Sequence, residues 1–182
     1  MATAGPRNLA AQLEGAYRTL AGTDVEEFDV FLVAADALRE LPEGGSWLWE
    51  LTSRGNNPTG GRQDVAVVPR GSDTSAYPFS TNQWVGCGSI SHQTFGLDSE
   101  WATLSLALAL QEHTPVHLTA LVSVLADGEQ IHSATVRAGA PSERVELDVS
   151  GVDSLRVEAT TLDTCGTAPK GYMALVQSYV LP

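Results

Sequence analysis

The sequence predicts a mainly β protein, a β-sandwich preceded by an N-terminal helical hairpin. Short runs of alternating apolar residues follow one another after residue 84, and a period of two is the pattern of half-buried strands. Turn residues separate these runs at close spacing, which is typical of a sandwich. Residues 7–42 instead place their apolar residues at helical spacing, which predicts two helices.

The helical hairpin is expected within residues 1–45. Gly22 can end the first helix in the left-handed conformation that glycine adopts easily. Thr23 and Glu26 form a capping box, which begins the second helix. Pro42 stops that helix, so the two helices are joined by a tight connection.

The second helix carries more apolar surface than a lone hairpin can bury. Phe28, Phe31 and Leu32 cluster within little more than one turn of it. This face either packs on the β domain of the same chain or docks on another copy or a protein partner. We expect these three residues to form an interaction surface.

Residues 46–83 are expected to form an irregular connection with short strands. The runs "SWLWEL" and "DVAVVP" have the composition of strands. The runs "RGNNPTGGRQ" and "RGSDTSAYPFSTNQ" are rich in turn-forming residues and predict loops.

The sandwich itself is expected over residues 84–182. Asp127-Gly128 predicts a tight hairpin turn, because both residues can adopt positive φ. Period-two alternation predicts a set of inward-facing residues on several strands: Leu104, Leu106, Leu108, Val145, Leu147, Leu155 and Val157.

The charge balance excludes some partners. The formal net charge is −12, which repels nucleic acid and anionic membrane. No apolar run reaches the roughly 20 residues of a membrane helix, and the N-terminus lacks the apolar region of a secretion signal. We therefore expect a cytoplasmic protein without nucleic-acid or membrane partners. The two cysteines, Cys87 and Cys165, are free thiols or one disulfide.

The stretch "LVSVLADGEQIHSATVRAGAPSERVELDVSGVDSLRVEA" resembles the NPCBM family of carbohydrate-binding modules. The residues that match the family pattern in order are Asp127, Gly128, Ser133, Pro141, Val149, Gly151, Val152, Leu155 and Val157. The resemblance extends over about residues 84–182. It implies a galactose-binding-like, jelly-roll-like β-sandwich and the binding of a glycan. Members often carry an Asp-Trp motif before the last strand, where this chain has "KGYMALVQSYVLP".

The sequence contains no pattern of a catalytic site. A metalloprotease helix, a phosphate loop and a nucleophile elbow are all absent from it. The four histidines lack metal-ligand spacing, so no metal, no cofactor and no enzymatic activity are expected. The ligand-binding candidates are a set of aromatic and imidazole side chains: Trp84, His92, Trp101 and Tyr172. Aromatic rings in a small sandwich serve either as core residues or as platforms for a sugar ring.

Two functions compete on these observations. Because the candidates do not assemble into a sugar site in the sequence, we expect a non-enzymatic intracellular assembly protein that docks through its helical hairpin. The alternative is a carbohydrate-binding module. The ligand and the oligomeric state stay open.

Overall fold

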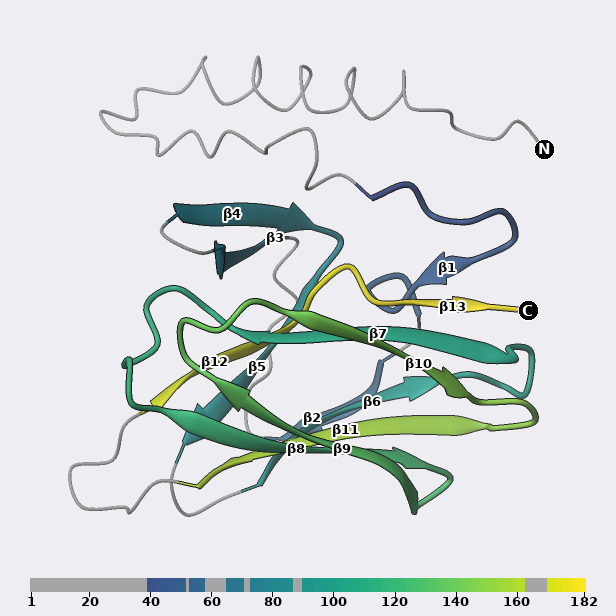
Figure 1. Ribbon diagram of the computed structural model, residues 1–182. Helices are drawn as coiled ribbons and strands as arrows, with labels where there is room; N and C mark the ends of the chain where they lie inside the picture. The colour runs from purple at the N-terminus through teal and green to yellow at the C-terminus, as the bar shows by residue number, and fades with distance from the viewer. Residues whose placement is uncertain (1–38, 52, 58–64, 71–72, 87–89, 163–169) are drawn as a thin grey trace, which may run out of the picture. The chain divides into compact units, whose positions relative to one another are not determined.

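The computed structural model describes residues 39–51, 53–57, 65–70, 73–86, 90–162 and 170–182. Its strands form two packed antiparallel sheets and one separate two-stranded hairpin (Figure 1). Sheet A contains β1 (Ser46–Trp47), β5 (Thr81–Gly86), β7 (Thr103–Leu110), β10 (Glu143–Asp148), β12 (Lys170–Leu175) and β13 (Tyr179–Leu181). Sheet B contains β2 (Ser53–Asn57), β6 (Ser91–Gly96), β8 (Thr119–Ala126), β9 (Glu129–Arg137) and β11 (Ser154–Thr161). The hairpin contains β3 (Val65–Arg70) and β4 (Asp73–Pro78).

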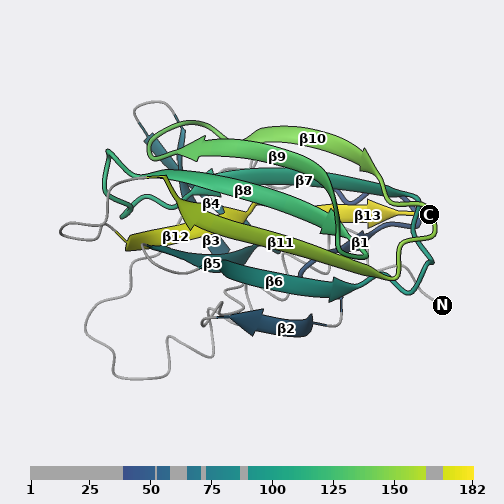
Figure 2. The same ribbon diagram turned by 90° about the horizontal axis from the view of Figure 1, so that it is seen from below.

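Strand β7 is the centre of sheet A. Strand β10 pairs with one of its edges, and β13 and β12 pair in succession with the other. Strands β1 and β5 extend the sheet beyond β13 and β12. Sheet B runs in the order β2-β6-β11-β8-β9, seen from below in Figure 2. Strands β5 and β10 therefore lie on opposite edges of sheet A.

The core between the sheets is built from the alternating residues that the sequence predicts to face inward. Leu104, Leu106 and Leu108 of β7 are buried there against Leu155 and Val157 of β11. The two predicted residues of β10 pack against the same core and are partly buried. The prediction of a mainly β sandwich with this inward set is confirmed.

The Asp127-Gly128 turn has the geometry that its sequence predicts. Asp127 has φ of 49° and Gly128 has φ of 90°. They join β8 to β9 with Ala126 opposite Glu129, as in a two-residue hairpin. The carboxylate of Asp127 also accepts hydrogen bonds from the backbone N–H groups of Asp153 and Ser154, at 3.2 and 2.8 Å. The turn is thereby fixed to the start of β11.

Part of the outer face of sheet A is covered, which the alternation along β7 did not predict. Ala107 and Ala109 of β7 and Ala174 of β12 pack against Ala66 and Val68 of the β3–β4 hairpin. Both faces of β7 are consequently buried, whereas the sequence predicted a half-buried strand. Small side chains on the outer face let the hairpin approach closely.

Over residues 46–83 the sequence analysis expected an irregular connection with short strands. Two of the described strands of this segment, β1 and β2, belong to the two sheets. The expected boundary between residues 83 and 84 falls inside β5. Pairing with strands that are distant in the sequence makes this segment regular, although its composition is rich in turn-forming residues.

The expected helical hairpin lies almost entirely outside the described residues, as do Phe28, Phe31, Leu32 and both cysteines. The described part of the chain contains no helix. Within it, no helix has the length and apolar character needed to cross a membrane.

Candidate functional site

Trp84 and Tyr172 are direct cross-strand partners in the pair β5–β12. They share the outer face of sheet A, because the residues that alternate with them, Val85 and Met173, point into the core. The Tyr172 side chain is 49% exposed, and Trp84 is partly exposed. The structure thus brings together two of the four ligand-binding candidates. We name these two residues the aromatic platform.

The indole of Trp84 lies along its own strand. A β-carbon built on Gly86 would fall 2.2 Å from Cζ2 and 2.5 Å from Cη2 of this ring. Real atoms do not approach so closely, so the ring occupies the space that a side chain at position 86 would need. Glycine at this position is what lets the indole lie over the strand.

A pair of amides borders the platform. Gln111 follows the end of β7, and its backbone N–H donates to the carbonyl of Tyr172 at 2.9 Å. Its side-chain amide donates to Oδ1 of Asn82 on β5. Since β12 lies between β7 and β5, this hydrogen bond spans β12 on the outer face, between Ala174 and Tyr172. The amide bridge separates the platform from the part of the sheet that the β3–β4 hairpin covers.

His92 lies on sheet B and does not join the platform. It sits on β6, opposite Glu158 of β11. Its Nδ1 lies 3.3 Å from a guanidinium nitrogen of Arg156, which also forms a 2.8 Å ion pair with Glu158. Burial lowers the pKa of His92, and the positive charge of Arg156 lowers it further, while Glu158 raises it.

Trp101 lies apart from the other three candidates. It precedes β7 and packs, partly buried, against the core cluster. This is the core role that the sequence analysis left open beside the platform role.

A second group of aromatic residues covers another part of sheet A and was not singled out from the sequence. Trp47 stacks on Phe79, with ring centroids 5.5 Å apart and an interplanar angle of 7°. Tyr179 meets Trp47 edge to face at 5.8 Å. The guanidinium of Arg144 lies 5.4 Å from the Tyr179 ring centroid. These rings are buried or partly buried, which makes them structural.

One side of the sandwich is closed by buried polar side chains of β5 and β6. The Gln83 amide donates to the carbonyl and hydroxyl of Ser91, at 2.9 and 3.0 Å. Ser91 Oγ donates in turn to the carbonyl of Ala159 at 3.3 Å. The amide of Gln93 reaches the carbonyl of Asn82. These bonds join sheet B to the β5 edge of sheet A.

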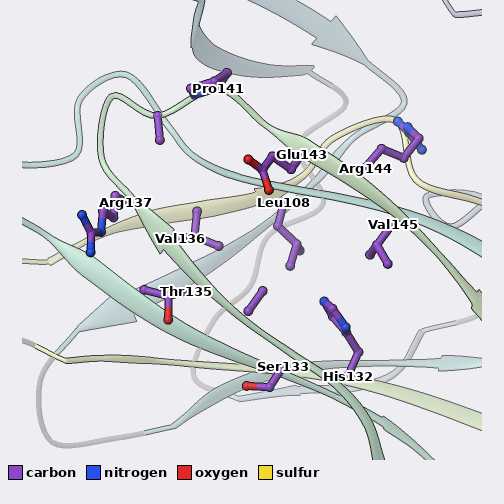
Figure 3. A pocket seen from close by; sticks show the side chains of 12 residues that line it. Leu108, His132, Ser133, Thr135, Val136, Arg137, Pro141, Glu143, Arg144 and Val145 are labelled. Carbon is purple, nitrogen blue, oxygen red and sulfur yellow. The ribbon is translucent and has the colours of Figure 1, made fainter.

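The opposite side of the sandwich holds a groove between β9 of sheet B and β10 of sheet A (Figure 3). Its volume is about 430 Å³. Leu108, Val136 and Val145 form an apolar floor, and Figure 3 shows His132 on one side of them and Glu143 on the other. Both polar residues occupy inward-facing positions of their strands. We name this site the edge groove.

The sequence held a signal for the edge groove that the analysis did not use. In "EQIHSATV", His132 alternates in phase with Ala134 and Val136 and therefore falls on an inward position. Glu143 is in phase with Val145 in the same way. A polar residue in phase with core residues is informative, because it marks a place where the strand leaves the core: His132 is partly buried and Glu143 is exposed.

Metal binding and catalysis find no support in the described part of the chain. No group of three or more His, Cys, Asp or Glu side chains there is arranged to hold a metal ion. The arrangement of the platform, an exposed aromatic pair bordered by fixed amides, can bind a ligand that has one apolar face and hydrogen-bonding edges.

The fold is a β-sandwich similar to that of CBM51 carbohydrate-binding modules. A CBM51 from Clostridium perfringens GH95, in complex with methyl-galactose, matches with a TM-score of 0.59 and 11% sequence identity. The match covers 75% of this chain and 99% of that one.

Two longer chains from Clostridium perfringens ZmpB also match over 75% of this chain. One contains the M60 catalytic domain with CBM51-1 and CBM51-2, with a TM-score of 0.60 and 16% identity. The other contains CBM51-2, in complex with GlcNAc, and INT domains, with a TM-score of 0.58 and 14% identity. The match spans only 15% and 31% of those chains. No protein-family model and no curated protein sequence matches this chain.

These comparisons confirm the resemblance predicted for residues 84–182 and overturn the main functional expectation. The sequence analysis favoured an intracellular assembly protein, which is wrong, because the proteins that share the fold are carbohydrate-binding modules. That expectation depended on an apolar helix face in residues 1–45 and on the failure to assemble a site from the sequence. Self-association through that hairpin has no support in the comparisons.

Proposed function

We propose that this protein is a non-catalytic carbohydrate-binding module that binds a glycan at the aromatic platform. The observation that carries the proposal is that Tyr172, which is 49% exposed, lies directly opposite Trp84 in the strand pair β5–β12. Two neighbouring rings offer a surface to the apolar face of a sugar. The sandwich fold shared with CBM51 modules supports this reading.

The surroundings of the platform supply the hydrogen bonds that a sugar edge requires. Gln111 is held in place by its side-chain bond to Asn82, so its amide needs little reordering when a ligand binds. The chain carries a net charge of −12. A neutral glycan is therefore a better ligand than a sulfated or phosphorylated one.

The experiment is a glycan-array screen of the purified protein, followed by calorimetric titration. Methyl-galactoside and N-acetylglucosamine serve as first probes, since related modules are described with these sugars. We expect Tyr172→Ala to weaken binding about tenfold, because removing one aromatic contact loses on the order of 1.5 kcal/mol.

The matched control is Ile131→Ala, which removes an exposed apolar side chain from β9 of the other sheet. This variant is expected to keep the affinity of the wild type. Equal affinity of wild type and Tyr172→Ala for every glycan bound on the array would refute the platform. The absence of any bound glycan would refute the function.

A further inference from the structure

We infer that the edge groove is a second sugar-binding site, distinct from the aromatic platform. The inference rests on the proposed glycan-binding function, and it adds a site on another part of the sandwich. The two sites do not overlap: the platform lies on the outer face near the β5 edge of sheet A, whereas the groove lies between the sheets beside β10.

The two sides of the sandwich are built differently, and the edge groove lies on the β9–β10 side. On the β5–β6 side, the buried amides of Gln83 and Gln93 cross from one sheet to the other. On the β9–β10 side, the space between the sheets is lined by Val136 and Val145 and stays open as the groove. Its volume of about 430 Å³ falls within the range of small-molecule sites, roughly 300 to 1,000 Å³.

The polar groups of the groove are available to a ligand. The side chains of His132 and Glu143 have no hydrogen-bond or ion-pair partner within the part of the chain that the structure describes. Arg144, which also borders the groove, is engaged elsewhere: its guanidinium donates to the carbonyls of Ser105, Val176 and Gln177. The groove therefore offers one carboxylate and one imidazole on either side of an aliphatic floor, and the guanidinium of Arg137 also lines it (Figure 3).

This lining selects the chemistry of the occupant. A wholly apolar ligand would desolvate His132 and Glu143 without giving them partners, which costs free energy. A phosphate or sulfate could pair with Arg137, but it would also meet the carboxylate of Glu143 and the negative field of a chain whose net charge is −12. A sugar ring satisfies both constraints, because one face is apolar and its hydroxyl groups can donate to a carboxylate and pair with an imidazole.

The test is NMR titration of the full chain with methyl-galactoside and with N-acetylglucosamine, using reporters that belong to one site each. The indole N–H of Trp84 reports on the platform. The methyl groups of Leu108, Val136 and Val145 report on the groove. We expect both sets of signals to shift in the wild type, and calorimetry to give two sugars bound per chain.

Variants separate the two sites. Tyr172→Ala is expected to silence the Trp84 reporter and to leave the groove methyl shifts in place. Glu143→Gln keeps the shape of the side chain. We expect it to lower the sugar affinity reported by the groove methyl signals about tenfold, because a hydrogen bond to a charged group typically contributes about that much. Glu129→Gln, an exposed change at the start of β9, is the charge control and is expected to leave both responses unchanged.

The outcomes distinguish this inference from the proposed function. If the Trp84 reporter responds and the groove methyls stay silent, the second site is refuted while the glycan-binding function stands. Silence of both sets with both sugars would refute both. If the groove methyls respond to an extended peptide and to neither sugar, the groove is a peptide site and the inference is wrong.

Discussion

A β-carbon on Gly86 would lie 2.2 Å from Cζ2 of Trp84, so the indole ring and a side chain at position 86 exclude each other. The two residues are separated by one position on β5 and therefore face the same side of the sheet. The position of the Trp84 ring in the platform depends on this glycine. Any side chain there must move the ring.

Gly86→Ala tests this dependence. We expect the indole to be displaced and the affinity for sugar to fall about tenfold, since the platform loses one of its two rings. Tryptophan fluorescence should change together with binding, while the β signature in circular dichroism is retained. The measurement is a calorimetric titration of the folded variant.

The control for that prediction is Gly151→Ala. Gly151 has φ of 74°, and a β-carbon added to it would have no heavy atom within 4 Å, so alanine there strains the backbone without touching Trp84. It is expected to lower stability by about 1 kcal/mol and to leave sugar affinity unchanged. Equal loss of affinity in both variants would mean that stability, and not the indole, governs binding.

Gly128→Val addresses the turn between β8 and β9. Gly128 has φ of 90° and open space around it, so the penalty comes from the backbone and not from a clash. We expect a loss of about 1 kcal/mol or more, because a β-branched residue fits positive φ poorly. Urea unfolding measures it. Gly128→Asn, which tolerates this conformation better, should lose clearly less; an equal loss would argue against a conformational cause.

The sequence predicted where the strands lie better than it predicted which elements pack against them. Alternation along β7 identified Leu104, Leu106 and Leu108 as core residues, because the period of a strand is a local property. The cover on the opposite face is not local. The sequence indicates this cover only through the residues that alternate with leucine: positions 107 and 109 are alanine and not polar residues. Small apolar residues on the supposed exposed face indicate a close-packed neighbour.

The candidate site shows the same limit. Trp84 and Tyr172 were both candidates, yet their pairing depends on the register of β5 and β12, which no local pattern specifies. The boundary at residue 84 divided β5, and the turn-rich composition of the preceding segment concealed its strands. The groove residues were missed because the analysis did not use the phase of His132 and Glu143 with the core residues of their strands. That β9 and β10 face each other across the groove is not a local property of the sequence.

Arg144 is expected to be a major contributor to stability. Its guanidinium donates to Ser105 Oγ at 3.1 Å and to the carbonyls of Val176 and Gln177 at 3.0 and 2.9 Å, and it lies over the Tyr179 ring. Burial lowers its pKa, but an arginine side chain stays protonated in proteins. We expect Arg144→Met to cost about 2–4 kcal/mol, because it leaves these acceptors without a donor.

Urea unfolding of Arg144→Met and of Arg137→Met makes the comparison. Arg137 is exposed on β9, and its replacement should change stability by no more than about 0.5 kcal/mol. Arg144→Lys keeps the charge and loses the planar fork of donors, so an intermediate loss is expected. A loss below about 1 kcal/mol for Arg144→Met would show that the hydrogen bonds of this guanidinium are replaceable by water.

The last prediction concerns pH and depends on His92. Burial lowers the pKa of this imidazole in the folded state, and the guanidinium of Arg156 lowers it further. The unfolded chain then takes up the proton at a higher pH than the folded protein does. As the pH falls below about 6.5, the unfolded state therefore binds more protons and the free energy of unfolding decreases, until the pH is also below the folded pKa.

His92→Asn removes this contribution. We expect the difference in urea midpoint between about pH 7.5 and pH 5.5 to be smaller in the variant than in the wild type, by a modest amount because the imidazole is only slightly buried. Arg156→Gln provides the complementary measurement. It removes one of the two causes that lower the pKa of His92, so an NMR titration of the imidazole C–H signals should show a higher pKa than in the wild type. An unchanged or lower pKa in Arg156→Gln would mean that the guanidinium beside Nδ1 does not act on the imidazole through its charge.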